Sequence, residues 1–337
     1  MDQRPSGGHL FEILLFSLSS MLLYYTGVGI FLFLAPLQVI ASRRGLRGLL
    51  IAAGAFLVVF LAIRFYPVVS TGGTATLDVL TYLEIGIITA LLLGLVAINL
   101  PLRRRPRTLF MVLGATAIAG LAAVPVGILL RADAGFQASM NGLFAEISKT
   151  LSSVFTTTGD GVANSLMVGI LEPARLRQIS EAYLLRSLLV DYVTLLSFSW
   201  WVGQAAASRA LVLVAGPRFQ FSHFRLEGYW LWPLIGSAAL VLADLAFGLS
   251  VWAYPVWNVA LVVLFLYGLQ GMAILWFLFD KHHIPRFLWI LLVVGLAILA
   301  ASPGAGVFIV LAVPVLGISE NWIRYRIPRE AAPPEED

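Results

Sequence analysis

Apolar runs about as long as a bilayer is thick recur along the chain, and they constrain its fold more than any other feature. A helix rises about 1.5 Å per residue, so about 20 apolar residues cross the roughly 30 Å hydrocarbon core. The clearest runs are residues 49–65, 77–100, 108–130, 183–201, 229–250 and 257–279. Of the 337 residues, 60% are hydrophobic and only 12% are charged, too few for the surface of a soluble protein. The sequence therefore predicts an all-α polytopic membrane protein.

Two further apolar stretches, 9–41 and 287–316, are each too long for one upright span. In the first, YYTGVG at 24–29 predicts a turn between two short helices, and Pro36 is expected to kink or end the second helix. One long tilted helix is the alternative. ASPGAG at 301–306 divides the second stretch in the same way. With both stretches divided, we expect nine or ten transmembrane helices.

The region 131–180 lacks a spanning pattern and separates the N-terminal helices of 1–130 from the C-terminal helices of 181–320. Apolar residues recur at helical spacing from Phe136 to Phe155, with Ser, Asn, Glu and Lys between them. This pattern predicts an amphipathic helix that lies over the outer face of the bundle like a lid. The polar, Pro-rich tail 321–337 is expected to be disordered.

Basic residues gather in alternate loops, which indicates the orientation of the chain. If the spans alternate and both ends lie inside, the arginines of 43–47 and 103–107 and the basic tail share one side. The positive-inside rule assigns that side to the cytoplasm. We therefore expect the N- and C-termini to be cytoplasmic.

Ionisable side chains inside the spans form the candidate site. The run 183–201 carries Arg186 and Asp191, and at about 100° per residue these lie about 140° apart on a helix and cannot satisfy one another. With the inferred orientation, further polar groups fall in the outer half of the membrane, with Asp78 closer to the headgroups. The candidate ligand-binding residues are Arg64, Tyr82, Glu84, Arg186, Asp191, Asp244 and Asn258.

Two interpretations of these groups remain open. They can line a polar pocket that opens to the outside, where their mixed signs suit a zwitterionic or polar solute. They can also form interhelical ion pairs, such as Glu84–Arg186 and Arg64–Asp191, that hold the helices together. Glu84 and Asp191 carry the pocket hypothesis, because their side chains are too short and too deep to reach the headgroups.

Several kinds of chemistry lack a signal in the chain. There is no cysteine, which excludes disulfides and thiolate metal ligands. His282 and His283 are adjacent in DKHHIPR, a pattern typical of a solvated loop rather than a metal site. No HExxH, GxSxG or phosphate-loop motif occurs, so we expect no catalytic residue, metal or cofactor. The net charge of +4 comes from loop arginines and gives little support for nucleic-acid binding.

Three segments carry a resemblance to a known family: APLQ and SRRGLRGLLIA within 35–52, FSHFRLEGYWLW at 221–232, and HHIPRFLWIL at 282–291. With these segments the chain resembles the YybS-like family of bacterial integral membrane proteins, which is similar to the substrate-binding (S) components of energy-coupling-factor vitamin transporters. The resemblance implies a bacterial cytoplasmic (inner) membrane protein with a vitamin-sized ligand in its outer half. It also implies an external ATPase and transmembrane coupling module as partner.

The alternative function is a non-transporting scaffold or accessory subunit of a multiprotein membrane complex. Small residues at helical spacing, Ala115, Ala119 and Ala123, suit close contact between helices. The basic inner loops and the amphipathic surface helix offer further binding surfaces. Other membrane proteins would then be the partners.

Overall fold

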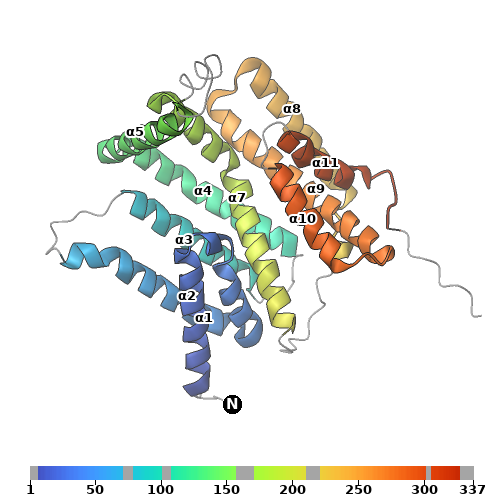
Figure 1. Ribbon diagram of the computed structural model, residues 1–337, viewed down its shortest axis with the longest axis horizontal. Coiled ribbons are helices and arrows are strands. Elements are labelled where there is room, and N and C mark those ends of the chain that lie inside the picture. The colour runs from blue at the N-terminus through green and yellow to red at the C-terminus, as the bar shows by residue number, and fades with distance from the viewer. Residues whose placement is uncertain are drawn as a thin grey trace, which may run out of the picture. The chain divides into compact units, whose positions relative to one another are not determined.

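A computed structural model of the chain describes residues 7–70, 79–100, 108–156, 171–209, 221–300 and 305–326 (Figure 1). Within these ranges every regular element is a helix, which confirms the all-α class. Six of the described helices are long and apolar enough to cross a membrane. Two shorter apolar helices accompany them, Leu10–Tyr25 and Phe287–Leu296. The chain is a polytopic helical membrane protein; the larger expected number of crossings stays a prediction.

The chain forms two compact units, Met1–Ala215 and Gly216–Asp337. The helices of the first are α1 (Gly7–Tyr25), η1 (Val28–Phe31), α2 (Leu34–Ser70), α3 (Val79–Ile98), α4 (Thr108–Ala132), α5 (Ala134–Thr156) and α7 (Pro173–Arg209). The helices of the second are η2 (Phe221–His223), η3 (Gly228–Trp230), α8 (Leu231–Phe247), η4 (Ser250–Trp252), α9 (Ala253–Lys281), α10 (Arg286–Ala300) and α11 (Ala305–Ser319). The expected boundaries at residues 130, 180 and 320, which separate the two groups of membrane helices, the amphipathic segment and the tail, stay predictions.

The first predicted turn is confirmed, but the helix after it differs from expectation. The chain turns between α1 and η1, where Gly27 has a φ of 70° that favours glycine. Pro36 lies in the first turn of α2, where its missing N–H costs nothing, so the kink or helix end predicted there is wrong. The loop expected at 43–47 is a sharp kink at Gly45 (φ 67°, ψ −165°), beyond which α2 continues to Ser70.

In the first unit, α7 packs against α2, α3, α4 and α5. A stripe of small and apolar residues at three- to four-residue spacing makes this possible, and Leu196, Ser199 and Gly203 in it are buried. A Cβ on Gly203 would lie 2.8 Å from the carbonyl oxygen of Ala35, so α7 and α2 approach closely there. Lipid offers no hydrophobic force between helices, and such close packing supplies dispersion contacts instead.

In the second unit, α9 packs against α8 and α11. A Cβ on Gly271 would lie 2.0 Å from the carbonyl oxygen of Val313, and one on Gly317 would lie 2.0 Å from that of Tyr267. The α9 and α11 backbones are therefore in direct contact, which only glycine permits. The stretch 287–316 forms two helices, α10 and α11, as predicted.

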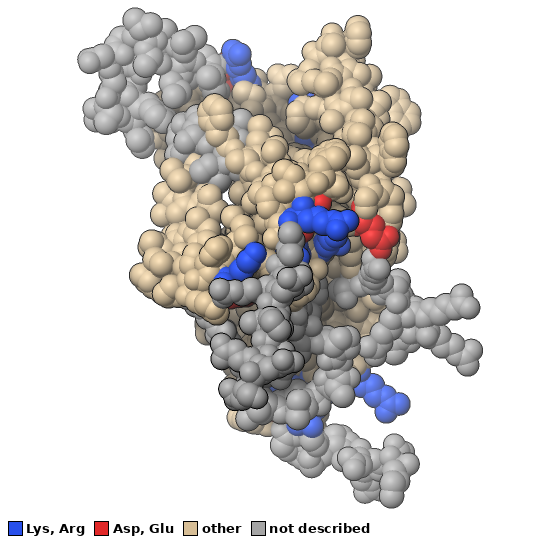
Figure 2. Space-filling view, turned by 90° about the vertical axis from the view of Figure 1, so that its right-hand side faces the viewer, with Lys and Arg blue, Asp and Glu red and all other residues tan. Residues whose placement is uncertain are grey.

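Large apolar side chains cover the outside of the helices. Leu121 is 75% exposed, and Phe247 is 85% exposed. On the face in Figure 2, most of the described surface belongs to residues other than Lys, Arg, Asp and Glu. An exterior of this kind is stable in lipid, because the hydrocarbon solvates it as well as a protein interior would.

Candidate functional site

Glu84 is held by two neighbouring helices. The hydroxyl of Tyr24, at the end of α1, donates a hydrogen bond to Oε1 of Glu84 on α3. Nη2 of Arg64, on α2, donates to the same oxygen and forms an ion pair with it. The side chains of Arg64 and Glu84 are 34% and 24% exposed, so the pair lies between a surface ion pair and a buried one. We call Tyr24, Arg64 and Glu84 the Glu84 cluster.

Aromatic rings surround the Glu84 cluster. The guanidinium carbon of Arg64 lies 5.9 Å from the ring centroid of Tyr25 and 5.7 Å from that of Phe60. The ring of Tyr24 meets those of Phe33 and Phe60 edge-on, at centroid distances of 5.5 and 5.6 Å. Cation–π attraction and ring packing hold the arginine and the phenol beside the carboxylate.

The ion pair of Arg64 differs from the pair expected from the sequence. Arg64 pairs with Glu84, so the expected pairs Arg64–Asp191 and Glu84–Arg186 are both wrong. The reason is the order of the helices: Arg64 lies about 9 Å before the end of α2, and Glu84 lies about 8 Å after the start of α3. Consecutive antiparallel helices bring two such positions to the same level. Asp78 lies outside the described residues.

Arg186 and Asp191 both lie on α7, but their environments differ. Arg186 is half-buried, whereas Asp191 is exposed. Oδ2 of Asp191 accepts a hydrogen bond from Oγ of Ser187, one turn earlier, at 2.8 Å. Asp191 lies in the same stripe as Leu188 and Phe198, which are 38% and 45% exposed. We call this stripe, with Leu184 at its start, the exposed face of α7.

Asp244 and Asn258 belong to the second unit, whereas the other five candidate residues belong to the first. Oδ1 of Asp244 accepts a hydrogen bond from the backbone N–H of Leu249 at 2.8 Å. Oδ2 accepts from Nε1 of Trp257 at 2.9 Å, so Asp244 joins the end of α8 to α9. Nδ2 of Asn258 donates to the carbonyl of Tyr254 at 2.8 Å. Both side chains therefore have structural contacts of their own.

The predicted amphipathic helix is present as α5, and Arg177 joins it to α7. Nη1 of Arg177 donates to Oδ1 of Asn141 at 2.5 Å, and Nη2 donates to Oε1 of Gln137. Nε donates to Glu181 on the same helix at 2.6 Å. Phe136 and Phe144 of α5 are buried. These contacts anchor α5, whereas a freely moving lid would lack them; residues 157–170 of the expected lid region lie outside the described part of the chain.

Several polar residues outside the predicted site also take part in interhelical contacts. Gln38 on α2 and Asn99, just after α3, exchange hydrogen bonds of 2.7 and 3.2 Å between their amides. Tyr24 belongs to the Glu84 cluster, although the sequence predicted only a turn at YYTGVG. Such groups lower the hydropathy of a span, but the pattern does not show which helix they contact. The pair YY at the end of a short apolar run is the one clue that the sequence held.

A second unpredicted network lies where α9 meets the segment after α11. Nε2 of Gln270 donates to Oε2 of Glu320 at 2.8 Å, and its Oε1 accepts from the backbone N–H of Leu226 at 3.0 Å. The guanidinium of Arg326 lies 3.0 Å from the Glu320 carboxylate and donates to the carbonyl of Ser222 at 2.8 Å. Burial lowers the pKa of Arg326, and the Glu320 carboxylate opposes that shift. The tail after Arg326 lies outside the described residues.

The carboxylates of Glu84 and Asp244 thus bind groups of neighbouring helices, whereas the carboxylate of Asp191 accepts a hydrogen bond from its own helix. Tyr82, at 56% exposure, lies on another face of α3. Among the residues that the structure describes, no cluster of three or more His, Cys, Asp or Glu residues offers a metal site. Comparison of the chain with protein-family models, curated proteins and solved structures finds no match.

Proposed function

We propose that the protein is a multi-pass protein of the bacterial cytoplasmic (inner) membrane that acts as a non-transporting scaffold or accessory subunit. It binds another membrane protein through the exposed face of α7. The observation that carries this proposal is Asp191, an exposed carboxylate in the middle of a spanning helix. A charged aspartate at the centre of a transmembrane helix costs about 3 kcal/mol in lipid. A partner helix that supplies a Lys, an Arg or a hydrogen-bond donor removes that cost.

The position of Asp191 supports contact with a partner within the bilayer. Within the apolar run 183–201, Asp191 lies about 12 Å from one end and about 15 Å from the other. At that depth a short carboxylate cannot reach the headgroups. The apolar side chains of Leu188 and Phe198, on either side along the stripe, suit packing against a second helix.

The contacts of the other predicted site residues favour this function over a solute pocket. Glu84 is held by Arg64 and Tyr24, and Asp244 is held by Trp257 and a backbone N–H. Groups held in this way must break existing contacts before they bind a solute. Asp191 needs no such exchange, because its recorded hydrogen bond comes from Ser187 of its own helix.

Purification in mild detergent, followed by exchange of charges, tests the proposal. Wild type and Asp191→Glu are expected to retain a stoichiometric membrane partner, and Asp191→Leu is expected to lose it. The isolated Asp191→Leu protein should be at least as stable as wild type, since a lipid-facing charge has been removed. Asp191→Arg should regain the partner when the matching basic residue of that partner is changed to Asp. Equal recovery with wild type and Asp191→Leu would refute the proposal.

The second candidate function is binding of a vitamin-sized solute, with an external ATPase module as partner. Its support is the partial exposure of Arg64 and Glu84, which leaves a polar solute access to both charges. The resemblance to the YybS-like family and to transporter S-components agrees with it. The test is thermal stabilisation across a vitamin and metabolite panel, with Glu84→Gln and Asp191→Asn as variants. Absence of any shift in wild type would refute solute binding.

The proposed orientation has both termini in the cytoplasm, as the basic loops indicate. Reporter fusions at Met1 and Asp337 test it, using one reporter that is active only in the cytoplasm and one that is active only outside. Activity of the outside reporter at either end would contradict the orientation of that end.

A further inference from the structure

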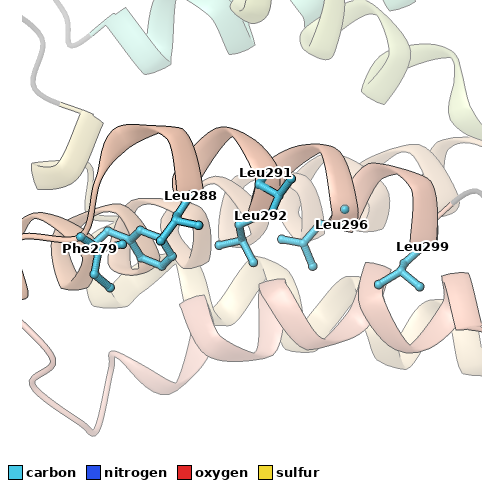
Figure 3. Close-up of a pocket in the computed structure, with 8 residues that line it drawn as sticks. Phe279, Leu288, Leu291, Leu292, Leu296 and Leu299 are labelled. Atoms are coloured by element: carbon cyan, nitrogen blue, oxygen red, sulfur yellow. The ribbon is translucent and has the colours of Figure 1, made fainter.

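An apolar groove runs along α10 (Figure 3). Its volume is about 470 Å³. It begins at Phe279, near the end of α9, and follows Leu288, Leu292 and Leu296 to Leu299. Figure 3 shows the leucines along α10, with the ring of Phe279, from the end of α9, beside Leu288. All residues that line the groove are apolar, so it offers no hydrogen bond to water or to a polar solute.

The groove lies on the outside of the helix and has free space at its centre. Leu291 and Leu299 are 58% and 47% exposed. A Cβ on Gly295 would meet no atom within 4 Å, so the missing side chain leaves room there. If the groove were empty, its lining atoms would lose dispersion contacts. In a membrane the group at hand to fill it is a hydrocarbon chain.

The length of the groove matches one leaflet of a bilayer. From Leu288 to Leu299 the helix rises about 17 Å, and half of the hydrocarbon core is about 15 Å thick. One acyl chain can therefore lie along α10 from the interface to the bilayer centre. The rings of Trp276 and Trp289 are in contact, with centroids 5.0 Å apart. Tryptophans of this kind mark the interface, here at the Phe279 end of the groove.

The Phe279 end also carries groups that suit a phosphate. Lys281, His282 and His283 follow Phe279 directly, and all three are exposed. Asp280, also exposed, is the acidic residue of this turn. The helix α10 starts at Arg286, so its first unpaired backbone N–H groups lie at this end and favour an anion. A phosphodiester here would be joined to a chain in the groove.

We propose that this groove binds one acyl chain of a membrane phospholipid, whose phosphate lies at Lys281 and the first turn of α10. This lipid site does not depend on either function proposed above. It is distinct from general solvation by lipid, because one lipid is retained at a defined place.

Native mass spectrometry with added phosphatidylglycerol tests the site. Gly295→Leu fills the groove, and Gly236→Leu on α8 is the matched control, because a Cβ there also meets nothing within 4 Å. Wild type and Gly236→Leu are expected to retain one phospholipid after detergent exchange. In Gly295→Leu its occupancy should fall about tenfold, because about ten dispersion contacts of the acyl chain are lost. Lys281→Ala should lower the occupancy less, about threefold.

A phospholipid with a photoreactive acyl chain provides the second measurement. Its adducts are expected on α10 at Leu292 and Leu296, and the same adducts should be lost in Gly295→Leu. Equal lipid occupancy in Gly295→Leu and wild type would overturn the proposal. So would a change of oligomeric mass in Gly295→Leu without any change in bound lipid, because a protein would then cover the groove.

Discussion

Replacing Glu84 with Gln removes the counter-charge of Arg64 within the helical bundle. Breaking a fully buried ion pair costs about 3–5 kcal/mol, and breaking an exposed one costs about 0–1 kcal/mol. The side chains of Arg64 and Glu84 are 34% and 24% exposed, between these limits. We therefore expect Glu84→Gln to lower the free energy of unfolding by about 2 kcal/mol. Tyr24→Phe removes one neutral donor to the same carboxylate and should cost about 1 kcal/mol.

A double-mutant cycle isolates the pair. The variants are Glu84→Gln, Arg64→Met and both together, with unfolding followed by titration with a denaturing detergent in mixed micelles. The double variant should be about 1–2 kcal/mol more stable than the sum of the single losses predicts. Tyr82→Phe, exposed on the same helix, is the control and should change stability by less than about 0.5 kcal/mol. A coupling energy below about 0.3 kcal/mol would refute the pairing. Both charges would then be available to bind a solute.

Three other substitutions test the contacts between helices. Gly317→Ala places a Cβ 2.0 Å from a carbonyl oxygen of α9, and we expect it to lower the free energy of unfolding by about 2–3 kcal/mol. Gly236→Ala is the control and should not lower it, because there is free space around Gly236. Asp244→Ala removes the acceptor of Trp257 Nε1 and of a backbone N–H. It should lower the free energy of unfolding by about 2 kcal/mol and shift the fluorescence maximum of that indole. An unchanged spectrum would contradict the contact. Arg177→Met removes the donors that join α5 to α7. It should speed hydrogen exchange in α5 and leave exchange in α9 unchanged. Equal protection of α5 in the variant and the wild type would show that Arg177 does not anchor α5.

The sequence predicts helices and their breaks well where lipid dictates the pattern, and less well where a single residue decides. The turn at 24–29 follows from YYTGVG, and the division of 287–316 follows from its breaker. Pro36 misleads because proline has two roles: it disrupts the interior of a helix but suits the first turn. Which role applies depends on where the helix begins, and α2 begins at Leu34, two residues before the proline. The arginines beside Gly45 suggested a loop there. The chain instead kinks at Gly45 and continues as a helix.

The candidate site was predictable in its charges but not in its contacts. Glu84 stood out because a carboxylate in a span is costly, and its pairing with Arg64 follows from the helical hairpin of α2 and α3. The contact of Tyr24 with Glu84 and the amide pair of Gln38 with Asn99 depend on how each helix is rotated about its axis. Uncharged residues in a sequence do not reveal that rotation. Asp244 has a local role at the end of α8, because the chain that follows supplies its donors.

Crosslinking from the exposed face of α7 in intact membranes tests the proposed partner most directly. A photoreactive residue at Leu188, one turn before Asp191, reports what covers this face, and one at Leu240 on α8, which is 50% exposed, is the control. We expect a discrete protein adduct from position 188 and lipid adducts from position 240. The protein adduct should persist in Asp191→Glu and disappear in Asp191→Leu. Lipid adducts alone at position 188, or a protein adduct that Asp191→Leu leaves unchanged, would contradict binding of a partner protein through Asp191.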